Sequence, residues 1–313
     1  MELSLLIFKD LLSKFLIAAA GFIAVKAKIS KTGDNKAIAV LLVYFFAPCA
    51  MLGTFSVEYE SSLLAKFGIT AGITLIVLAL FAIIGRILNK SIGLDEPSQA
   101  CMIFTNNGSF IISVISLLLG SEAVFYLSAF ITVHVIFFWT YGYKLLSGQD
   151  GIKLKNLINP NIIAVLVGFA LFVTRIELPE IVSSAITSMG SMNSSMAMFL
   201  IGMSLGMCNF KSVFAQKKVW LLSIGRMIMM PAIVVIILAL TGVAERFPEL
   251  ATPLLVVVIA ASCPMANNVL EVTLINPDTD ENAIERSASV STLTTLMCIV
   301  TIPVMIMLYQ ALC

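Results

Sequence analysis

Charged side chains are scarce in this sequence. Only 12% of its 313 residues are Asp, Glu, Lys or Arg, whereas about 25% is usual for soluble domains. No basic block and no alternation of basic with aromatic residues occurs, which argues against nucleic acid as a partner. The longest connection between apolar runs, residues 147–160, is too short for a soluble domain. The composition therefore indicates an integral membrane protein with several spans.

Residues for metal or catalytic chemistry are also few. The sequence has one histidine, His134, and its six cysteines form no Cys-x-x-Cys pair. It has no His-Glu-x-x-His motif and no paired aspartates within apolar runs, so an intramembrane enzyme would lack a recognisable reactive group. We therefore expect no enzyme activity, no cofactor and no metal, and we interpret the cysteines as small buried hydrophobic residues.

Apolar runs of spanning length make up most of the chain. Hydrophobic residues account for 59% of it, and a transmembrane helix needs about 20 of them in succession. The sequence predicts an all-α fold with ten transmembrane helices, at residues 5–25, 36–55, 67–88, 98–119, 122–146, 161–175, 179–206, 219–241, 251–275 and 284–311.

Lysine and arginine in the connections predict the orientation, because positive loops stay in the cytoplasm. One side has 13 basic residues: Lys26, Lys28, Lys31, Lys36, Arg86, Lys90, Lys144, Lys153, Lys155, Lys211, Lys217, Lys218 and Arg286. The other side has 3: Lys66, Arg175 and Arg246. We therefore expect a plasma-membrane protein with both termini outside the cell.

The two halves of the chain have the same layout. Residues 1–150 and residues 151–313 each hold five of the predicted spans. Because five is an odd number, the two repeats must have opposite orientations in the membrane. Inverted repeats of this kind place a substrate near the bilayer midplane, where interrupted helices meet.

Two of the apolar runs, Cys101–Leu119 and Leu254–Ile275, are interrupted at their centres. Candidate substrate-binding residues lie at these interruptions: Asn106, Asn107, Gly108 and Ser109 in the first, and Pro264, Asn267 and Asn268 in the second. Irregular backbone survives at membrane depth only inside protein or beside water. Each interruption creates a half-helix N-terminus, which favours an anion. We expect Pro264 in the first turn of the new half-helix, and we expect a carboxylate substrate. The alternative is that the asparagines only cap the broken ends.

Three ionisable residues within spans are candidates for coupling or gating: Glu271, Arg226 and His134. An acid at membrane depth often belongs to a proton relay. The alternative for Glu271 is a hydrated position near the cytoplasmic end of its span. Arg226 either contacts an anion, snorkels to the cytoplasmic face or forms a structural ion pair. For His134, the alternative is a packed, hydrogen-bonded histidine.

Several motifs resemble the auxin efflux carrier family, which includes bacterial permeases for malate and malonate. They are Phe138-Trp139-Thr140-Tyr141-Gly142, Asn159-Pro160-Asn161-Ile162-Ile163, the run 198–205, Arg226 with Met230-Pro231, and the segments 291–293 and 301–303. The Asn-x-Gly of Asn106 and Gly108 matches the family's fourth span, and Pro264, Ala266 and Asn268 match its ninth.

The resemblance implies a secondary transporter for organic anions, such as dicarboxylates, with broken helices that cross in spans four and nine. It also implies an elevator-like movement, often within a homodimer. Spans 1, 2, 6 and 7 would form the scaffold domain, and spans 3–5 and 8–10 the transport domain. The alternative is a sodium-coupled symporter resembling the bile-acid carriers, which share the ten-span plan.

The charge asymmetry predicts that residues 147–160 face the cytoplasm. A single cysteine that replaces Gly148 in a cysteine-free background should resist an impermeant thiol reagent added to intact cells, and it should react once the membrane is opened. Labelling of this cysteine from outside would contradict the predicted orientation.

Overall fold

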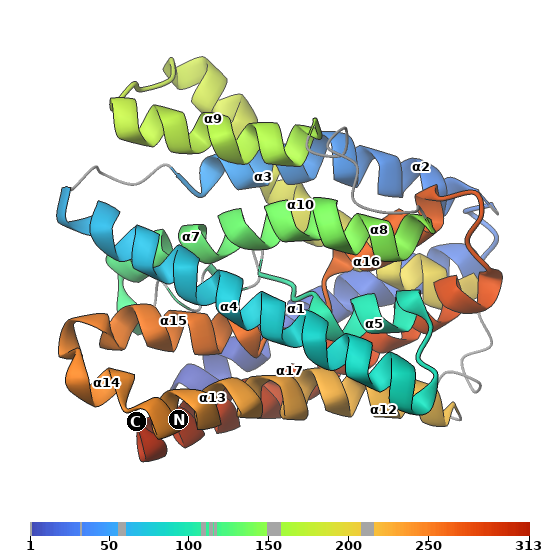
Figure 1. The fold of residues 1–313 in the computed structure, drawn as a ribbon. Helices are drawn as coiled ribbons and strands as arrows, with labels where there is room; N and C mark the ends of the chain where they lie inside the picture. The colour runs from blue at the N-terminus through green and yellow to red at the C-terminus, as the bar shows by residue number, and fades with distance from the viewer. Residues whose placement is uncertain are drawn as a thin grey trace.

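The computed structural model describes residues 2–31, 33–55, 61–107, 111–112, 115, 118–148, 158–207 and 216–313. These residues form helices and short connections, with no strand beyond one isolated bridge between Thr105 and Met265 (Figure 1). An apolar chain favours this outcome because a helix satisfies its own backbone groups where water is absent. The predicted all-α fold class is confirmed.

Helical segments occupy every predicted span range. In the first half they are α1 (Glu2–Lys26), α2 (Asp34–Leu41), α3 (Ala47–Gly53), α4 (Ser61–Ile92), α5 (Glu96–Ile103), α7 (Ser121–Phe137) and α8 (Tyr143–Ser147). In the second half they are α9 (Pro160–Thr174), α10 (Glu180–Met207), α12 (Lys217–Ile224), α13 (Met230–Thr241), α14 (Val243–Arg246), α15 (Ala251–Ala261), α16 (Asn267–Ile275) and α17 (Glu281–Leu312).

In the part of the chain that the structure describes, three short π-helical turns continue these helices without a break. They are Leu42–Phe46 between α2 and α3, Phe138–Gly142 between α7 and α8, and Gly225–Met229 between α12 and α13. Two of them coincide with the motifs at Phe138–Gly142 and Arg226. A π-turn rotates the side chains after it relative to those before it, and such turns are frequent at functional sites.

Five helical stretches of the described chain are long and apolar enough to cross a membrane: Asp34–Gly53, Leu64–Ile92, Glu122–Ser147, Lys217–Thr241 and Glu281–Leu312. Two further apolar helices are shorter, Pro160–Thr174 and Pro248–Ala261. The structure thus supports several spans, and the number ten stays a prediction.

The helices pack in two groups. In one group α1 packs along α10, and α3 lies against both α9 and α10. In the other group α4 packs on α5, α7 and α15, while α17 contacts α12, α13, α15 and α16. The groups meet mainly where α16 contacts α2 and where α10 contacts α17.

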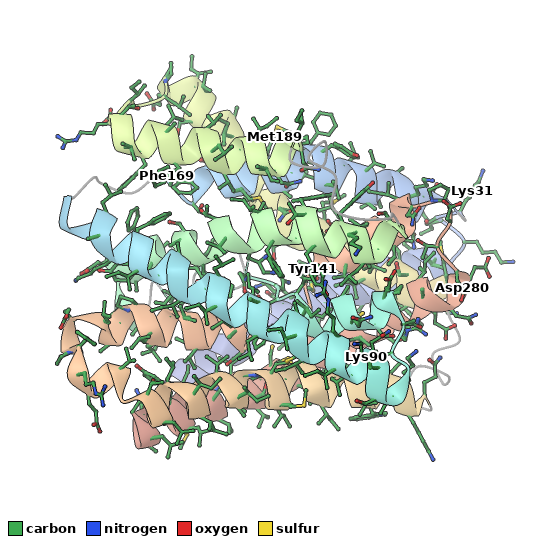
Figure 2. All side chains as sticks on the ribbon, viewed as in Figure 1. Lys31, Lys90, Tyr141, Phe169, Met189 and Asp280 are labelled. Atoms are coloured by element: carbon green, nitrogen blue, oxygen red, sulfur yellow. The ribbon has the colours of Figure 1, made fainter. Side chains whose placement is uncertain are left out.

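The basic connections and the termini lie at opposite ends of the molecule. Lys31, Lys90 and Asp280 are at one end of the helices (Figure 2), whereas both chain ends and α14 are at the other (Figure 1). The helix arrangement is therefore compatible with the predicted orientation, in which these two ends face opposite sides of the membrane.

Glycines allow α1 and α10 to approach closely. A Cβ atom on Gly202 would overlap the carbonyl oxygen of Ala18, and one on Gly21 would overlap the carbonyl oxygen of Phe199. Small residues at such contacts let helices associate in a membrane, where no hydrophobic driving force holds them together. The backbones of the first and seventh predicted spans are therefore in direct contact.

We expect Gly202→Ala to destabilise the protein by about 1–3 kcal/mol, because the added methyl overpacks a backbone contact. The control is Gly72→Ala on α4, where a Cβ meets nothing within 4 Å. That change should stabilise the helix by about 0.5–1 kcal/mol. Melting temperatures in detergent would measure both effects, and equal shifts would contradict the close contact of α1 with α10.

Candidate functional site

Both predicted interruptions are present in the structure. α5 ends at Ile103 and Phe104 is extended, with φ −92° and ψ 137°, and helix is described again from Ile111. α15 ends at Ala261, and α16 begins only at Asn267. Among the described residues of the breaks, the N–H groups of Thr105, Asn106, Met265 and Ala266 have no helical acceptor, so they must be satisfied in another way.

The two interrupted segments satisfy one another. The Asn106 N–H donates to the Pro264 carbonyl at 2.8 Å, and the Ala266 N–H donates to the Phe104 carbonyl at 3.0 Å. These bonds flank the antiparallel bridge between Thr105 and Met265. The two breaks therefore lie in direct contact, although 160 residues separate Thr105 from Met265 in the sequence.

In each break, a side chain from a neighbouring helix accepts a hydrogen bond from one further backbone N–H. The Thr105 N–H donates to Nε2 of His134 on α7 at 3.1 Å, and the Met265 N–H donates to Oγ1 of Thr294 on α17 at 3.2 Å. An acceptor Nε2 requires a neutral imidazole with its proton on Nδ1. The packed, hydrogen-bonded interpretation of His134 is thus correct, and the residue also lines the cavity described below.

Pro264 does not occupy the first turn of α16, so that expectation is wrong. The helix begins three residues later, with Ala266 in an extended conformation before it. Pro264 lies in the extended segment, where its carbonyl accepts the Asn106 N–H. Its missing N–H still costs nothing, because this position of the bridge requires only an acceptor.

A cavity of about 400 Å³ lies beside the paired breaks. Both breaks, α16 and α7 line one part of it, and α3 and α10 line the other. The lining residues are Ala47, Cys49, Ala50, Met51, Gly53, Thr54, Thr105, Asn106, Asn107, Ile112, Ile131, His134, Val135, Thr187, Gly190, Ser191, Asn193, Ala197, Ala266, Asn267, Asn268 and Glu271. The cavity therefore lies between the two packing groups of helices.

Within the described part of the chain, three polar atoms of the lining residues are buried without a protein partner. They are Nδ2 of Asn107, Oδ1 of Asn267 and Oε2 of Glu271. The hydroxyl of Thr105 donates to Oδ1 of Asn107. Nδ2 of the same amide is therefore the donor that has no partner. An unsatisfied buried polar group costs about 1–3 kcal/mol, so a bound molecule or water that pairs with these atoms would be stabilised.

Glu271 is buried, with 2% of its surface exposed. It lies in the second turn of α16 and lines the cavity. Glu271 is therefore not hydrated as the alternative supposed, because α16 packs against α2 and α17.

Arg226 is fully buried and does not snorkel. Its guanidinium donates to the carbonyls of Met102, Ala261 and Cys263. It is not among the residues that line the cavity. No carboxylate of the described chain forms a salt bridge with it, so a structural ion pair is not seen there.

The structure brings most of the candidate substrate-binding residues together. Asn106, Asn107, Asn267 and Asn268 line one cavity, Pro264 supports it through the bridge, and Gly108 and Ser109 lie outside the described residues. In the wall from α3 and α10, the sequence singled out only Asn193 as a residue that could line a cavity. The other wall residues gave only the signal of isolated polarity in apolar runs, as at Thr54 and Thr187. Within the described residues, no group of three His, Cys, Asp or Glu side chains is placed to hold a metal ion.

Comparison with known proteins agrees with this architecture. The profile of a family described as membrane transport protein matches residues 6–152 and 149–306, which together cover nearly the whole chain. A comparison with curated proteins finds no match. On the strength of the family match, the apolar helices and the paired breaks, this chain belongs to the membrane transport protein family, that is, to the auxin efflux carrier family.

Proposed function

We propose that the protein is a secondary transporter that carries small organic anions across the plasma membrane. The observation that carries this proposal is the cavity at the paired breaks, with its unpaired amide donor at Asn107. A volume of about 400 Å³ is within the usual range for small-molecule sites.

The polar groups of the cavity favour a carboxylate. The N-terminus of α16 opens at Asn267 and Asn268, both of which line the cavity. A helix N-terminus carries about half a positive elementary charge and unpaired N–H groups. Together with Nδ2 of Asn107, these groups can donate hydrogen bonds to carboxylate oxygens. A bare metal cation could bind the carboxylate of Glu271, but the positive end of the α16 dipole would repel it.

Matching hydrogen bonds support ten spans in two inverted repeats with broken helices in spans four and nine. Thr105 pairs with His134 and Met265 pairs with Thr294, and both separations are 29 residues. One offset of 160 residues therefore carries each partner of the first pair onto its counterpart in the second. The same functional contact is thus made once in each half.

The position of the cavity supports an elevator-like movement. α3 and α10 belong to the group of spans 1, 2, 6 and 7, the proposed scaffold domain. The breaks and α7 belong to spans 3–5 and 8–10, the proposed transport domain. A substrate held by the breaks could move with the transport domain past α3 and α10. We also propose that the protein forms a homodimer and that both termini lie outside the cell.

A second cavity, of about 1040 Å³, adjoins the first and is a proposed access route. Gly53 and Thr187 line both cavities, and Arg175 and Glu177 line the second. The connection that holds Arg175 is predicted to face the exterior. The route supports a conformation in which the site opens outward.

Glu271 is the proposed coupling group. Two carboxylates in one poorly hydrated cavity repel strongly, so an anionic substrate binds best when Glu271 carries a proton. Release of substrate and proton on the other side would couple the anion to the proton gradient. A sodium-coupled symporter is the alternative, and the same assay distinguishes it.

Uptake by proteoliposomes from a panel of labelled mono- and dicarboxylates tests the function. We expect uptake of at least one carboxylate by the wild type. Asn268→Ala and Asn107→Ala should weaken apparent affinity by roughly 10- to 150-fold, because a hydrogen bond to a charged group contributes about 1.5–3 kcal/mol. Gly72→Ala is the control. Wild-type affinity in both asparagine variants would overturn the proposed site.

The same assay tests coupling. We expect wild-type uptake to increase when the exterior is made acidic, and Glu271→Gln to transport without this pH dependence. Glu285→Gln, on a solvent-accessible part of α17, is the matched control and should keep it. An unchanged pH dependence in Glu271→Gln would exclude Glu271 as the proton-coupling group, and a requirement for sodium would favour the alternative.

A further inference from the structure

The guanidinium of Arg226 lies where the two broken helices end. α5 ends at Ile103 and α15 ends at Ala261. Arg226 donates from Nη1 to the Met102 carbonyl at 3.3 Å, and from Nη2 to the carbonyls of Ala261 and Cys263, the latter at 3.1 Å. One side chain therefore binds the C-terminal ends of both half-helices.

The charges at this point balance without a carboxylate. Each helix C-terminus carries about half a negative elementary charge, so two of them together offset the single positive charge of a guanidinium. This matters because Arg226 is fully buried, and a buried charge with no compensation is strongly unfavourable. The ring of Phe81, 5.5 Å from the guanidinium carbon, adds a cation–π contact.

The local sequence fits a guanidinium at this place. Arg226 is in the π-helical turn Gly225–Met229. A Cβ on Gly225 would lie 2.5 Å from the terminal methyl of Met102, so glycine allows the end of α5 to approach the turn. The planar fork of arginine can bind several carbonyls at once, which the single ammonium of lysine does less well.

Transporters with discontinuous helices commonly use these same elements, unwound carbonyls and half-helix C-terminal ends, to coordinate a coupling sodium ion. We infer that Arg226 is a built-in cation that fills such a carbonyl site permanently, so that transport by this protein requires no alkali cation. This inference rests on the proposed function for its transport consequence, but its structural part stands on the contacts of Arg226. Arg226 is a positioning residue, because it holds the breaks from outside the cavity.

The inference predicts that an emptied site accepts a free cation of the same shape. In Arg226→Ala, guanidinium ions at low millimolar concentration should raise the melting temperature in detergent by several degrees relative to choline at equal ionic strength. They should not raise that of the wild type. Arg86→Ala is the matched control, because Arg86 packs on Tyr141 at 5.3 Å rather than on carbonyls. Equal effects of guanidinium on both alanine variants would overturn the inference.

Two further variants keep the test decisive if Arg226→Ala does not fold. Arg226→Lys keeps the charge, and Arg226→Met keeps much of the volume without it. We expect the lysine variant to melt between the wild type and the methionine variant. A methionine variant as stable as the lysine variant would show that the carbonyls need no cation, and would overturn the inference.

The transport consequence is tested separately with the wild type in proteoliposomes. Carboxylate uptake should be unchanged when choline replaces sodium on both sides. A loss of about tenfold or more would overturn the claim that Arg226 replaces a sodium ion. If no carboxylate is taken up at all, the proposed function fails, while the melting experiments still decide whether Arg226 fills a cation site.

Discussion

Backbone hydrogen bonding in a medium without water is the constraint on which this structure depends. A helix that stops at membrane depth leaves donors and acceptors that cost several kcal/mol each if unpaired. Here the break after α5 and the break after α15 pair with each other through Asn106, Pro264, Phe104 and Ala266. Each interruption therefore satisfies backbone groups of the other.

The paired breaks also separate charge. The C-terminal ends of α5 and α15 meet at Arg226, whereas the N-terminus of α16 opens into the cavity. The negative dipole ends are thus compensated inside the protein, and a positive end stays available to a ligand. In a low-dielectric environment this arrangement supports the proposed anion, although no lysine or arginine is among the described residues that line the cavity.

The sequence was informative where a polar or helix-breaking residue stands within an apolar run. Asparagine pairs and a proline inside apolar runs predicted both breaks, and the scarcity of charge predicted the fold class. It was less informative where geometry depends on distant contacts. Nothing local shows that Thr105 donates to His134, that Pro264 precedes α16 by three residues, or that Thr54 and Thr187 share a cavity. The partners of Arg226 were not predicted for the same reason, because these carbonyls belong to two other helical segments.

The bridge between Thr105 and Met265 has a consequence for biosynthesis. The two segments are 160 residues apart, and ribosomes add about 5–20 residues per second. The first break must therefore wait roughly 8–32 s for its partner. During that time its open backbone groups need water, lipid headgroups or an insertion factor to satisfy them. The first break can thus complete its pairing only after residues 264–266 have been synthesised, so the speed of translation through the second half sets how long these groups wait.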